Sequence, residues 1–172
     1  MPAMDPVSYR RATAADIPAL IELRCAFLAE VNGADPNDPE LSQALFRYFS
    51  SHIPTGDFVA FCGIVDDRTV ATSGLVFHHH PPSSKNLVGK QAYIMNMYTV
   101  PKWRGRGIGT RLLQELLAVA RATRCHRVRL NALPKAERVY TRMGFARVDG
   151  EMELSLTVPD KQVNLFPGPT LV

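Results

Sequence analysis

The sequence predicts a mixed α/β (α+β) domain in which a mostly antiparallel sheet is flanked by helices. Two features of its 172 residues indicate this. Apolar runs of strand length alternate with helical patterns, and a glycine-rich turn joins a strand to an amphipathic helix late in the chain. A chain of this length holds one domain with a substantial core. We expect that domain to cover residues 1–158, followed by a loosely held tail at 159–172.

The first half of the chain predicts a strand, two helices and a β-hairpin. Thr13 stands three residues before Asp16, an arrangement related to the capping box that begins many helices, and Gly33 ends this helix. Residues 34–40 contain two prolines and are expected to form a loop. The expected elements are a strand at 7–11, a helix from Thr13, a weaker helix at 41–52, and hairpin strands at 58–65 and 69–77.

The second half begins with a proline-rich segment, 78–90, which is expected to be an exposed loop. The next strand, 92–100, is nearly continuous in β-forming and apolar residues, as expected of a central strand covered on both faces. The remaining elements are expected to be a helix at 108–122, a strand at 127–130, a short helix at 134–143 stopped by Gly144, and closing strands at 145–148 and 152–158.

The composition excludes several classes of protein. A hydrophobic share of 46% and a charged share of 21% are those of an ordinary globular protein rather than a disordered or fibrous one. No apolar run approaches the roughly 20 residues that span a bilayer, and the first residues lack a secretory signal pattern. We therefore expect a cytoplasmic protein that binds no membrane. The three cysteines lack CxxC spacing, which predicts reduced core thiols rather than disulfides or a zinc site.

The formal net charge of +4 is unevenly distributed along the chain. Basic residues gather at 102–111 and 121–129, and such clusters favour an anionic ligand such as a phosphorylated cofactor. Nucleic-acid binding is not expected, because basic residues are not interleaved with aromatic side chains that could stack on bases. No metal site is expected at His78-His79-His80, because adjacent strand residues point to alternate faces and no further ligand stands at suitable spacing.

A turn that leads from a strand directly into a helix presents the first free N–H groups of the helix, and its partial positive charge, to a ligand. Gly105, Gly107 and Gly109 lack the Cβ atoms that would hold a phosphate away from these groups. The turn follows neither the P-loop pattern, because no Gly-Lys-Ser/Thr follows, nor the Rossmann pattern, because its glycines alternate strictly. Charged donors are expected from Arg104, Arg106 and Arg111, and the combination suits a pyrophosphate.

Two motifs in the chain resemble those of the GNAT superfamily of N-acetyltransferases. The run Met97-Tyr98-Thr99-Val100-Pro101-Lys102-Trp103-Arg104-Gly105-Arg106-Gly107-Ile108-Gly109 is similar to the family's acetyl-CoA motif, Gln/Arg-x-x-Gly-x-Gly/Ala after a strand and a proline. The second motif is a strand followed by a short helix that carries Tyr140 and ends in Gly144-Phe145. The resemblance covers residues 7–156. It implies a GNAT-like sheet in which the strand ending near Val100 splays away from its neighbour.

The resemblance also implies a cosubstrate, acetyl-CoA, and the residues that hold it. The backbone of Met97, Tyr98 and Thr99 should pair with the pantetheine arm like an added strand. A backbone N–H near Met97 or Tyr98 should stabilise the oxyanion, and Tyr140 should be the general acid that protonates the departing thiolate. The residues expected at the pyrophosphate are Arg104, Gly105, Arg106, Gly107, Ile108, Gly109 and Thr110.

The motifs do not identify a general base. The strand at 127–130 lacks the glutamate that some family members carry, and Leu133 stands where many have an asparagine that contacts the cofactor. Glu30, at the end of the first helix, Glu151, Glu153 or a chain of waters could serve instead.

Alternation along the strand at 92–100 predicts which side chains share a face. Tyr93, Met95 and Met97 are expected in the core. Asn96 and Tyr98 would then face the acceptor site.

The sequence therefore predicts an N-acetyltransferase that acts on a primary amine of a small molecule or a protein, by direct attack in a ternary complex. The attacking amine must be neutral, although a free lysine-type amine has a pKa of about 10.4. A non-catalytic acyl-CoA-binding sensor is the alternative, and the missing glutamate is consistent with it. An exposed edge strand near the C-terminus would permit a homodimer.

Overall fold

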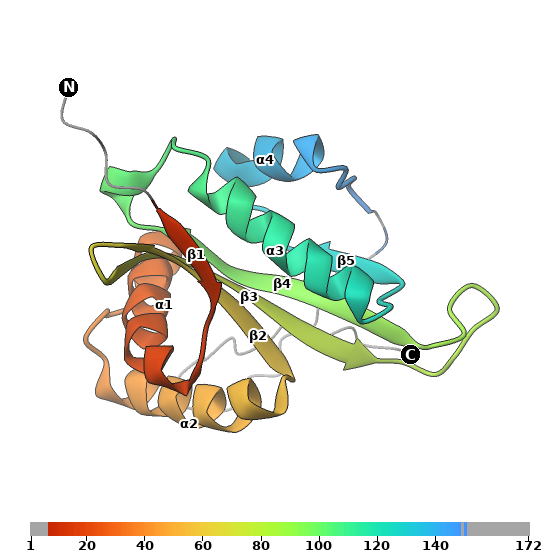
Figure 1. Cartoon of the computed structure of the whole chain (residues 1–172), viewed down its shortest axis with the longest axis horizontal. Coiled ribbons are helices and arrows are strands. Elements are labelled where there is room, and N and C mark those ends of the chain that lie inside the picture. The colour runs from red at the N-terminus through yellow and green to blue at the C-terminus, as the bar shows by residue number, and fades with distance from the viewer. Residues whose placement is uncertain (1–6, 149, 151–172) are drawn as a thin grey trace. The chain divides into compact units, whose positions relative to one another are not determined.

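The computed structural model describes residues 7–148 and 150 of the chain (Figure 1). The chain divides into two compact units, Met1–Asn131 and Ala132–Val172, and each is described by itself. The strand predicted at 152–158 and the tail predicted at 159–172 lie outside the described residues.

The first unit is built on a five-stranded sheet with the strand order β1-β2-β3-β4-β5. Neighbouring strands pair antiparallel from β1 to β4, whereas β4 and β5 run parallel. A parallel pair needs a crossover connection, which α3 (Ile108–Ala122) supplies. The predicted mixed, mostly antiparallel sheet is confirmed. Its strands are β1 (Ser8–Arg11), β2 (Phe58–Val65), β3 (Arg68–His79), β4 (Lys90–Thr99) and β5 (Arg127–Leu130).

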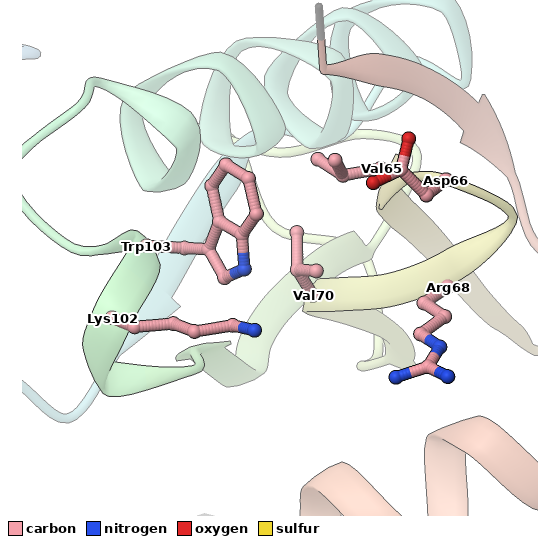
Figure 2. A pocket seen from close by; sticks show the side chains of 6 residues that line it. All are labelled: Val65, Asp66, Arg68, Val70, Lys102 and Trp103. Atoms are coloured by element: carbon pink, nitrogen blue, oxygen red, sulfur yellow. The ribbon is translucent and has the colours of Figure 1, made fainter. Parts of the chain in front are cut away.

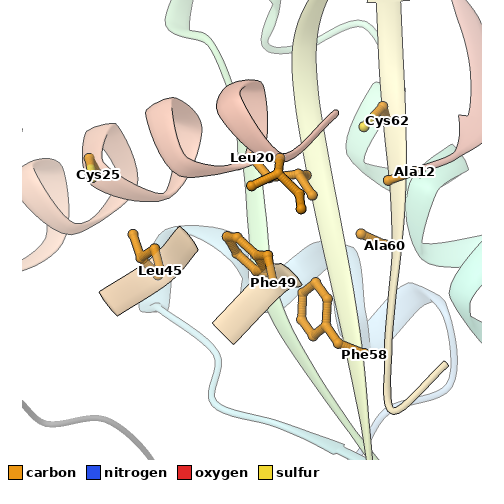
Figure 3. Packing of buried hydrophobic residues seen from close by; sticks show 9 residues of the cluster. Ala12, Leu20, Cys25, Leu45, Phe49, Phe58, Ala60 and Cys62 are labelled. Carbon is orange, nitrogen blue, oxygen red and sulfur yellow. The ribbon is translucent and has the colours of Figure 1, made fainter. Parts of the chain in front are cut away.

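Helices cover both faces of this sheet (Figure 1). The helices α1 (Ile17–Asn32) and α2 (Pro39–Thr55) lie on one face, and α3 lies on the other. Burial of apolar side chains on both faces is the main stabilising contribution to such a fold. On the α3 face, Ala71, Ile108 and Leu112 form a buried cluster, which we call the α3 cluster. On the other face, the core shown in Figure 3 contains Ala12, Ile17, Leu20, Cys25, Leu45, Phe49, Phe58, Ala60 and Cys62.

The start of α1 is fixed by Asp16, the last residue of a short 3-10 turn, Ala14–Asp16. Its carboxylate accepts hydrogen bonds from the guanidinium of Arg10 at 2.7 and 2.8 Å and from the backbone N–H of Thr13 at 2.8 Å. These partners hold the pKa of the buried Asp16 carboxyl at about 2, below its ordinary value of 3.8. The predicted helix start at Thr13 is confirmed, and the ion pair explains why Asp16 can be buried.

We expect the ion pair of Asp16 to make the fold sensitive to acid. Because folding lowers the pKa of Asp16, the ionised carboxylate stabilises the folded state by about 2 kcal/mol at neutral pH. This contribution falls to roughly half at about pH 3 and is lost below about pH 2. Asp16→Asn should therefore lower the free energy of unfolding in urea by about 2 kcal/mol at pH 7 and by clearly less at pH 3.

The control for this measurement is Asp67→Asn, which changes an exposed aspartate in the β2–β3 turn. It should leave the pH dependence of the free energy of unfolding unchanged. If Asp16→Asn destabilised the protein equally at both pH values, its effect would come from packing rather than from the charge.

The helix α2 begins two residues earlier than predicted, at Pro39, and ends later, at Thr55. Asp38 caps it by accepting from the backbone N–H of Glu40 at 2.9 Å. Pro39 occupies the first turn, where the missing N–H of a proline breaks no helical hydrogen bond. The prediction of a loop through residue 40 was therefore wrong, because this proline begins a helix.

The hairpin of β3 and β4 is longer than predicted. His78 and His79 belong to β3 and pair with Gln91 and Lys90, so the connection is confined to 80–89. The N–H of His80 still donates to the carbonyl of Gly89 at 2.8 Å. The prolines at 81 and 82 suggested an irregular segment from residue 78, but the cross-strand hydrogen bonds continue up to them.

The second unit contains a short 3-10 turn, Pro134–Ala136, and the helix α4 (Glu137–Arg142), which confirms the predicted short helix. Gly144 follows the helix with a φ of +91°, as expected of its stop. The prediction of a strand at 145–148 is wrong, because these residues are irregular. Phe145 instead folds back on the helix, and its N–H donates to the carbonyl of Tyr140 at 3.1 Å.

The three cysteines are free thiols, as predicted. Cys25 and Cys62 are buried and Cys125 is half-buried. Burial raises the pKa of the Cys62 thiol to about 11, so it stays protonated at neutral pH and acts as an apolar core residue. Among the described residues, no helix combines the length and the apolar character that crossing a bilayer requires.

Candidate active site

The candidate site is organised around the C-terminal half of β4. The pairing of β4 with β5 begins at Gln91 and Arg127 and stops at Ile94 and Leu130, whereas β4 itself continues to Thr99. Beyond Ile94, the edge of β4 that faces away from β3 has no strand partner among the described residues. Unpaired N–H and C=O groups on a strand edge can bind another extended chain. The predicted splay of the two strands is confirmed.

A β-bulge interrupts β4 just after this pairing ends. Against β3, Met95 stands opposite Gly74 but Tyr98 stands opposite Thr72, so β4 contains one extra residue. Asn96 lies in the bulge with a φ of +55°, a left-handed value that asparagine adopts more readily than most residues. A bulge takes local backbone groups out of the ladder and changes the direction of the side chains that follow.

The bulge overturns the prediction that Met95 and Met97 share a face. Met95 packs against the core beneath α1 and α2, whereas Met97 packs against the α3 cluster. The extra residue shifts the alternation of side chains, which sequence reasoning took to be strict. Tyr98 lies toward α1, where its ring meets that of Phe27 edge-on with centres 6.2 Å apart. Asn96 is buried, and its Oδ1 has no hydrogen-bond partner among the described residues.

The glycine turn between β4 and α3 leaves room for a ligand. Gly105 and Gly107 have φ values of +76° and +78°, which favour glycine, and Gly107 is the N-cap of α3. A Cβ atom added at Gly105, Gly107 or Gly109 would meet no side chain or non-adjacent backbone atom of the described residues within 4 Å. The glycines therefore border open space, which a bulky anion could enter.

The same turn supplies hydrogen-bond donors. The first hydrogen bond of α3 runs from the N–H of Arg111 to the carbonyl of Gly107 at 3.0 Å. The N–H groups that precede Arg111 in the helix therefore have no acceptor within it, and the helix dipole adds partial positive charge. These groups belong to Ile108, Gly109 and Thr110. A helix start of this kind is suited to bind a phosphate.

All three arginines expected to add charged donors have side chains engaged with protein groups. Arg106 donates to the carbonyl of Lys102 at 3.1 Å, and its Cζ lies 4.6 Å from the centre of the Trp103 ring. Arg111 pairs with Glu115, one helical turn further along α3, at 2.6 Å. The donors at the turn are consequently backbone N–H groups more than guanidinium groups.

The third of these arginines, Arg104, connects the glycine turn to α1 through hydrogen bonds. Its Nη1 and Nη2 donate to the two carboxylate oxygens of Glu30 at 3.0 and 2.5 Å, and its Nε donates to the carbonyl of Thr99 at 2.8 Å. The hydrogen bonds with Glu30 raise the pKa of Arg104, so its charge persists at any working pH. Arg104 therefore joins the end of β4, the glycine turn and the last turn of α1.

A pocket of about 340 Å³ opens beside Trp103 (Figure 2). Its walls come from the β2–β3 turn with the adjoining strand ends and from the short 3-10 turn Pro101–Trp103, and no residue of β4 lines it. It is therefore distinct from the unpaired edge of β4. The residues that line it are Val65, Asp66, Arg68, Val70, Lys102 and Trp103.

Tyr140 belongs to the second unit, on α4. Its side chain is buried, and its ring meets that of Phe145 edge-on with centres 5.9 Å apart. Burial raises the pKa of the Tyr140 hydroxyl, which keeps its proton at neutral pH. A protonated hydroxyl can donate a proton to a departing anion, as the role of general acid requires.

The three consecutive histidines lie at the end of β3 and the start of the connection to β4. Burial, together with the neighbouring His80 and His79, lowers the pKa of His78. Within residues 7–148 and 150, no group of three or more His, Cys, Asp or Glu side chains is placed to hold a metal ion.

Most of the chain matches one known protein family. Residues 19–145, which include the strand, the glycine turn and the tyrosine helix, match the Acetyltransferase (GNAT) family. This chain belongs to the GNAT family. It is therefore an acyltransferase, and the predicted family resemblance is confirmed.

The chain is similar to three other proteins, two of them solved structures. A crystal structure of a predicted acetyltransferase with acetyl-CoA from Clostridium acetobutylicum is 32% identical, with a TM-score of 0.80 over 87% of this chain and 96% of that one. Glucosamine-6-phosphate N-acetyltransferase from Arabidopsis thaliana has the same fold at 17% identity, with a TM-score of 0.67 over 89% and 100% of the two chains. Glucosamine 6-phosphate N-acetyltransferase from Trypanosoma brucei brucei is 27% identical over 96 residues. That match spans 56% of this chain and 63% of the curated relative.

Two features of this GNAT site were missed by sequence reasoning. The bulge at Asn96 has only a weak signal, an asparagine within a strand of aromatic and apolar residues. The ion pair of Glu30 and Arg104 joins residues 74 positions apart and has no local signal. Glu30 was considered as a general base, but both of its oxygens accept from Arg104.

We expect Glu30 to position Arg104 rather than to take a proton from the substrate. Glu30→Gln should raise the Kd for acetyl-CoA about fivefold, because the turn loses one charged contact, and should keep the acidic limb of the pH profile of kcat. Glu22→Gln, which changes an exposed glutamate on the same helix, is the matched control and should alter neither quantity. Loss of the acidic limb in Glu30→Gln alone would identify Glu30 as the base.

Proposed function

We propose that this GNAT protein transfers the acetyl group of acetyl-CoA to a primary amine, by direct attack of the neutral amine on the thioester in a ternary complex. The observation that carries the proposal is the unpaired edge of β4, which leads into the glycine turn at the start of α3. An unpaired strand edge can bind an extended chain of amides, and the helix start beyond it can bind a pyrophosphate. Acetyl-CoA presents these two groups in that order.

The residues proposed to hold acetyl-CoA divide into two groups. The backbone of Met97, Tyr98 and Thr99 would pair with the pantetheine arm, because the edge of β4 that faces away from β3 has no strand partner there among the described residues. The N–H groups of the turn from Gly105 to Thr110 would hold the pyrophosphate. The Clostridium acetobutylicum relative contains acetyl-CoA, which supports this cosubstrate.

Arg104 and Arg106 would support the pyrophosphate site mainly by fixing the turn. Their guanidinium groups bind Glu30, Thr99 and Lys102, all of which border the turn. The family match spans residues of both units, which supports a single acetyltransferase domain over residues 1–158.

The chemistry needs an oxyanion donor and an acid. The bulge at Asn96 takes backbone groups out of the ladder beside Met97, and an N–H there would stabilise the oxyanion formed when the amine attacks the thioester. Tyr140, whose raised pKa keeps it protonated, would give its proton to the departing CoA thiolate. Glu30 is engaged by Arg104, and Glu151 and Glu153 lie outside the described residues, so we propose that water accepts the proton of the amine.

The substrate of two relatives indicates the kind of acceptor to expect. Two of them act on glucosamine 6-phosphate, a small molecule with a primary amine. This favours a small-molecule acceptor over a protein one for this chain.

The experiment that tests the proposal is an acceptor screen. The protein is incubated with acetyl-CoA and a panel of primary amines, and release of the CoA thiol is followed while the acetylated product is identified by mass. We expect CoA release that depends on both the amine and the protein. Binding of acetyl-CoA in a thermal shift assay without acetylation of any amine would overturn the proposal.

A further inference from the structure

Arg24 lies on α1, facing the same region as Tyr98 of β4. It is half-buried, and its Cζ lies 5.4 Å from the centre of the Phe27 ring. The Phe27 ring in turn contacts the Tyr98 ring at 6.2 Å, and the guanidinium of Arg104 lies 5.4 Å from the Tyr98 ring. Arg24, Phe27, Tyr98 and Arg104 thus form a continuous series between α1 and β4, which we call the α1–β4 row.

The α1–β4 row carries more positive than negative charge. Both carboxylate oxygens of Glu30 accept hydrogen bonds from Arg104. Arg24 forms no ion pair with a carboxylate of the described residues. Within the part of the chain that the structure describes, Arg104 is therefore neutralised by a carboxylate and Arg24 is not.

Burying the charge of Arg24 costs free energy unless an anion binds beside it. Burial lowers the pKa of Arg24, which means that neighbouring atoms keep water from a group that stays charged. A contact with the face of Phe27 compensates only in part, because a cation above an aromatic ring gains less than a charged hydrogen bond. A bound phosphate or carboxylate would offset this cost, because the guanidinium matches the geometry of either anion.

We propose that Arg24 binds an anionic group, a phosphate or a carboxylate, on the amine acceptor, which makes anionic small-molecule amines the substrate class. This inference rests on the proposed function. The planar guanidinium matches either anion with two parallel hydrogen bonds. An acceptor held at Arg24 would extend over Phe27 and Tyr98 toward the segment of β4 proposed to hold the pantetheine arm.

The pyrophosphate turn does not explain the charge of Arg24. The donors of that turn are the backbone N–H groups at the start of α3, and Arg104 stands between the turn and Tyr98. Arg24 lies at the opposite end of the α1–β4 row. The charge of Arg24 is thus available to a second ligand, and in a two-substrate enzyme that ligand is the acceptor.

The test compares matched pairs of acceptors in the acetylation assay. The phosphate arm uses glucosamine 6-phosphate and glucosamine, and the carboxylate arm uses L-alanine and L-alaninamide. We expect kcat/KM to favour the anionic member of at least one pair by about 30-fold, mainly through KM, as one charged bidentate contact provides. The arm with the larger preference identifies the anion.

Variants locate the preference at Arg24. Arg24→Gln should remove the preference by raising KM for the anionic acceptor, while it leaves KM for the neutral acceptor and for acetyl-CoA within about twofold. Arg24→Lys, which keeps the positive charge, should keep part of the preference for the anionic acceptor. Arg47→Gln removes the same charge from an exposed position on α2 and should change nothing.

The outcomes separate this inference from the proposed function. If neutral amines are acetylated as well as anionic ones, or if Arg24→Gln affects both members of a pair equally, Arg24 only covers Phe27 and the inference fails while the proposed function stands. If acetyl-CoA binds but no amine in the full panel is acetylated, the proposed function fails and this inference fails with it.

Discussion

Gly107→Asp is expected to weaken the binding of acetyl-CoA on the order of 100-fold. Gly107 is the N-cap of α3, and a side chain there would enter open space beside the N–H groups proposed to hold the pyrophosphate. A carboxylate at this position would repel the pyrophosphate and occupy part of its volume. Aspartate tolerates a φ of +78° better than most residues, so the fold should survive the change. The measurement is the Kd for acetyl-CoA by calorimetry.

Gly56→Asp is the matched control for this variant. Gly56 has the same φ of +78°, ends α2, and its nearest atom to an added Cβ is Nη2 of Arg11 at 3.9 Å. Both substitutions should cost about 1 kcal/mol of stability through backbone strain, but only Gly107→Asp should reduce affinity. If the two variants had equal affinity for acetyl-CoA, the glycine turn would not be the site that binds the pyrophosphate.

Tyr140→Phe is expected to lower kcat about 100-fold and to leave the Kd for acetyl-CoA within about twofold. The substitution removes only the hydroxyl, and the ring can keep its contact with Phe145 at 5.9 Å. Because burial raises the pKa of Tyr140, the wild-type enzyme should keep its activity up to a pH above 10, and the variant should have a low kcat at all pH values. Steady-state kinetics across pH and the melting temperature of both proteins provide the measurement.

Tyr9→Phe is the control for loss of a tyrosine hydroxyl. Tyr9 lies in β1, is half-buried and packs against the α3 cluster, so its hydroxyl has no role in the proposed chemistry. Its kcat should match that of the wild type. Wild-type turnover in Tyr140→Phe would show that another group, or water, protonates the thiolate.

Much of the strand, turn and helix around the proposed pyrophosphate site could be predicted from local sequence. A strand, a proline, three glycines and an amphipathic helix follow one another within a short stretch, so their order alone places the start of α3 at the end of β4. The roles of the arginines could not be predicted in this way. Whether Arg104 faces a ligand or Glu30 depends on where α1 lies, and α1 is distant in sequence.

The sequence by itself determined the mixed fold, the order of its elements and the glycine turn, because periodicity, capping residues and glycines act on neighbours along the chain. Only the tertiary structure decided which side chains of β4 share a face and what surrounds Arg24. The bulge at Asn96 is a mismatch between two strands, and the placement of Arg24 follows from the packing of α1 on β4. Both are properties of pairs of elements, and the pattern within one element does not contain them.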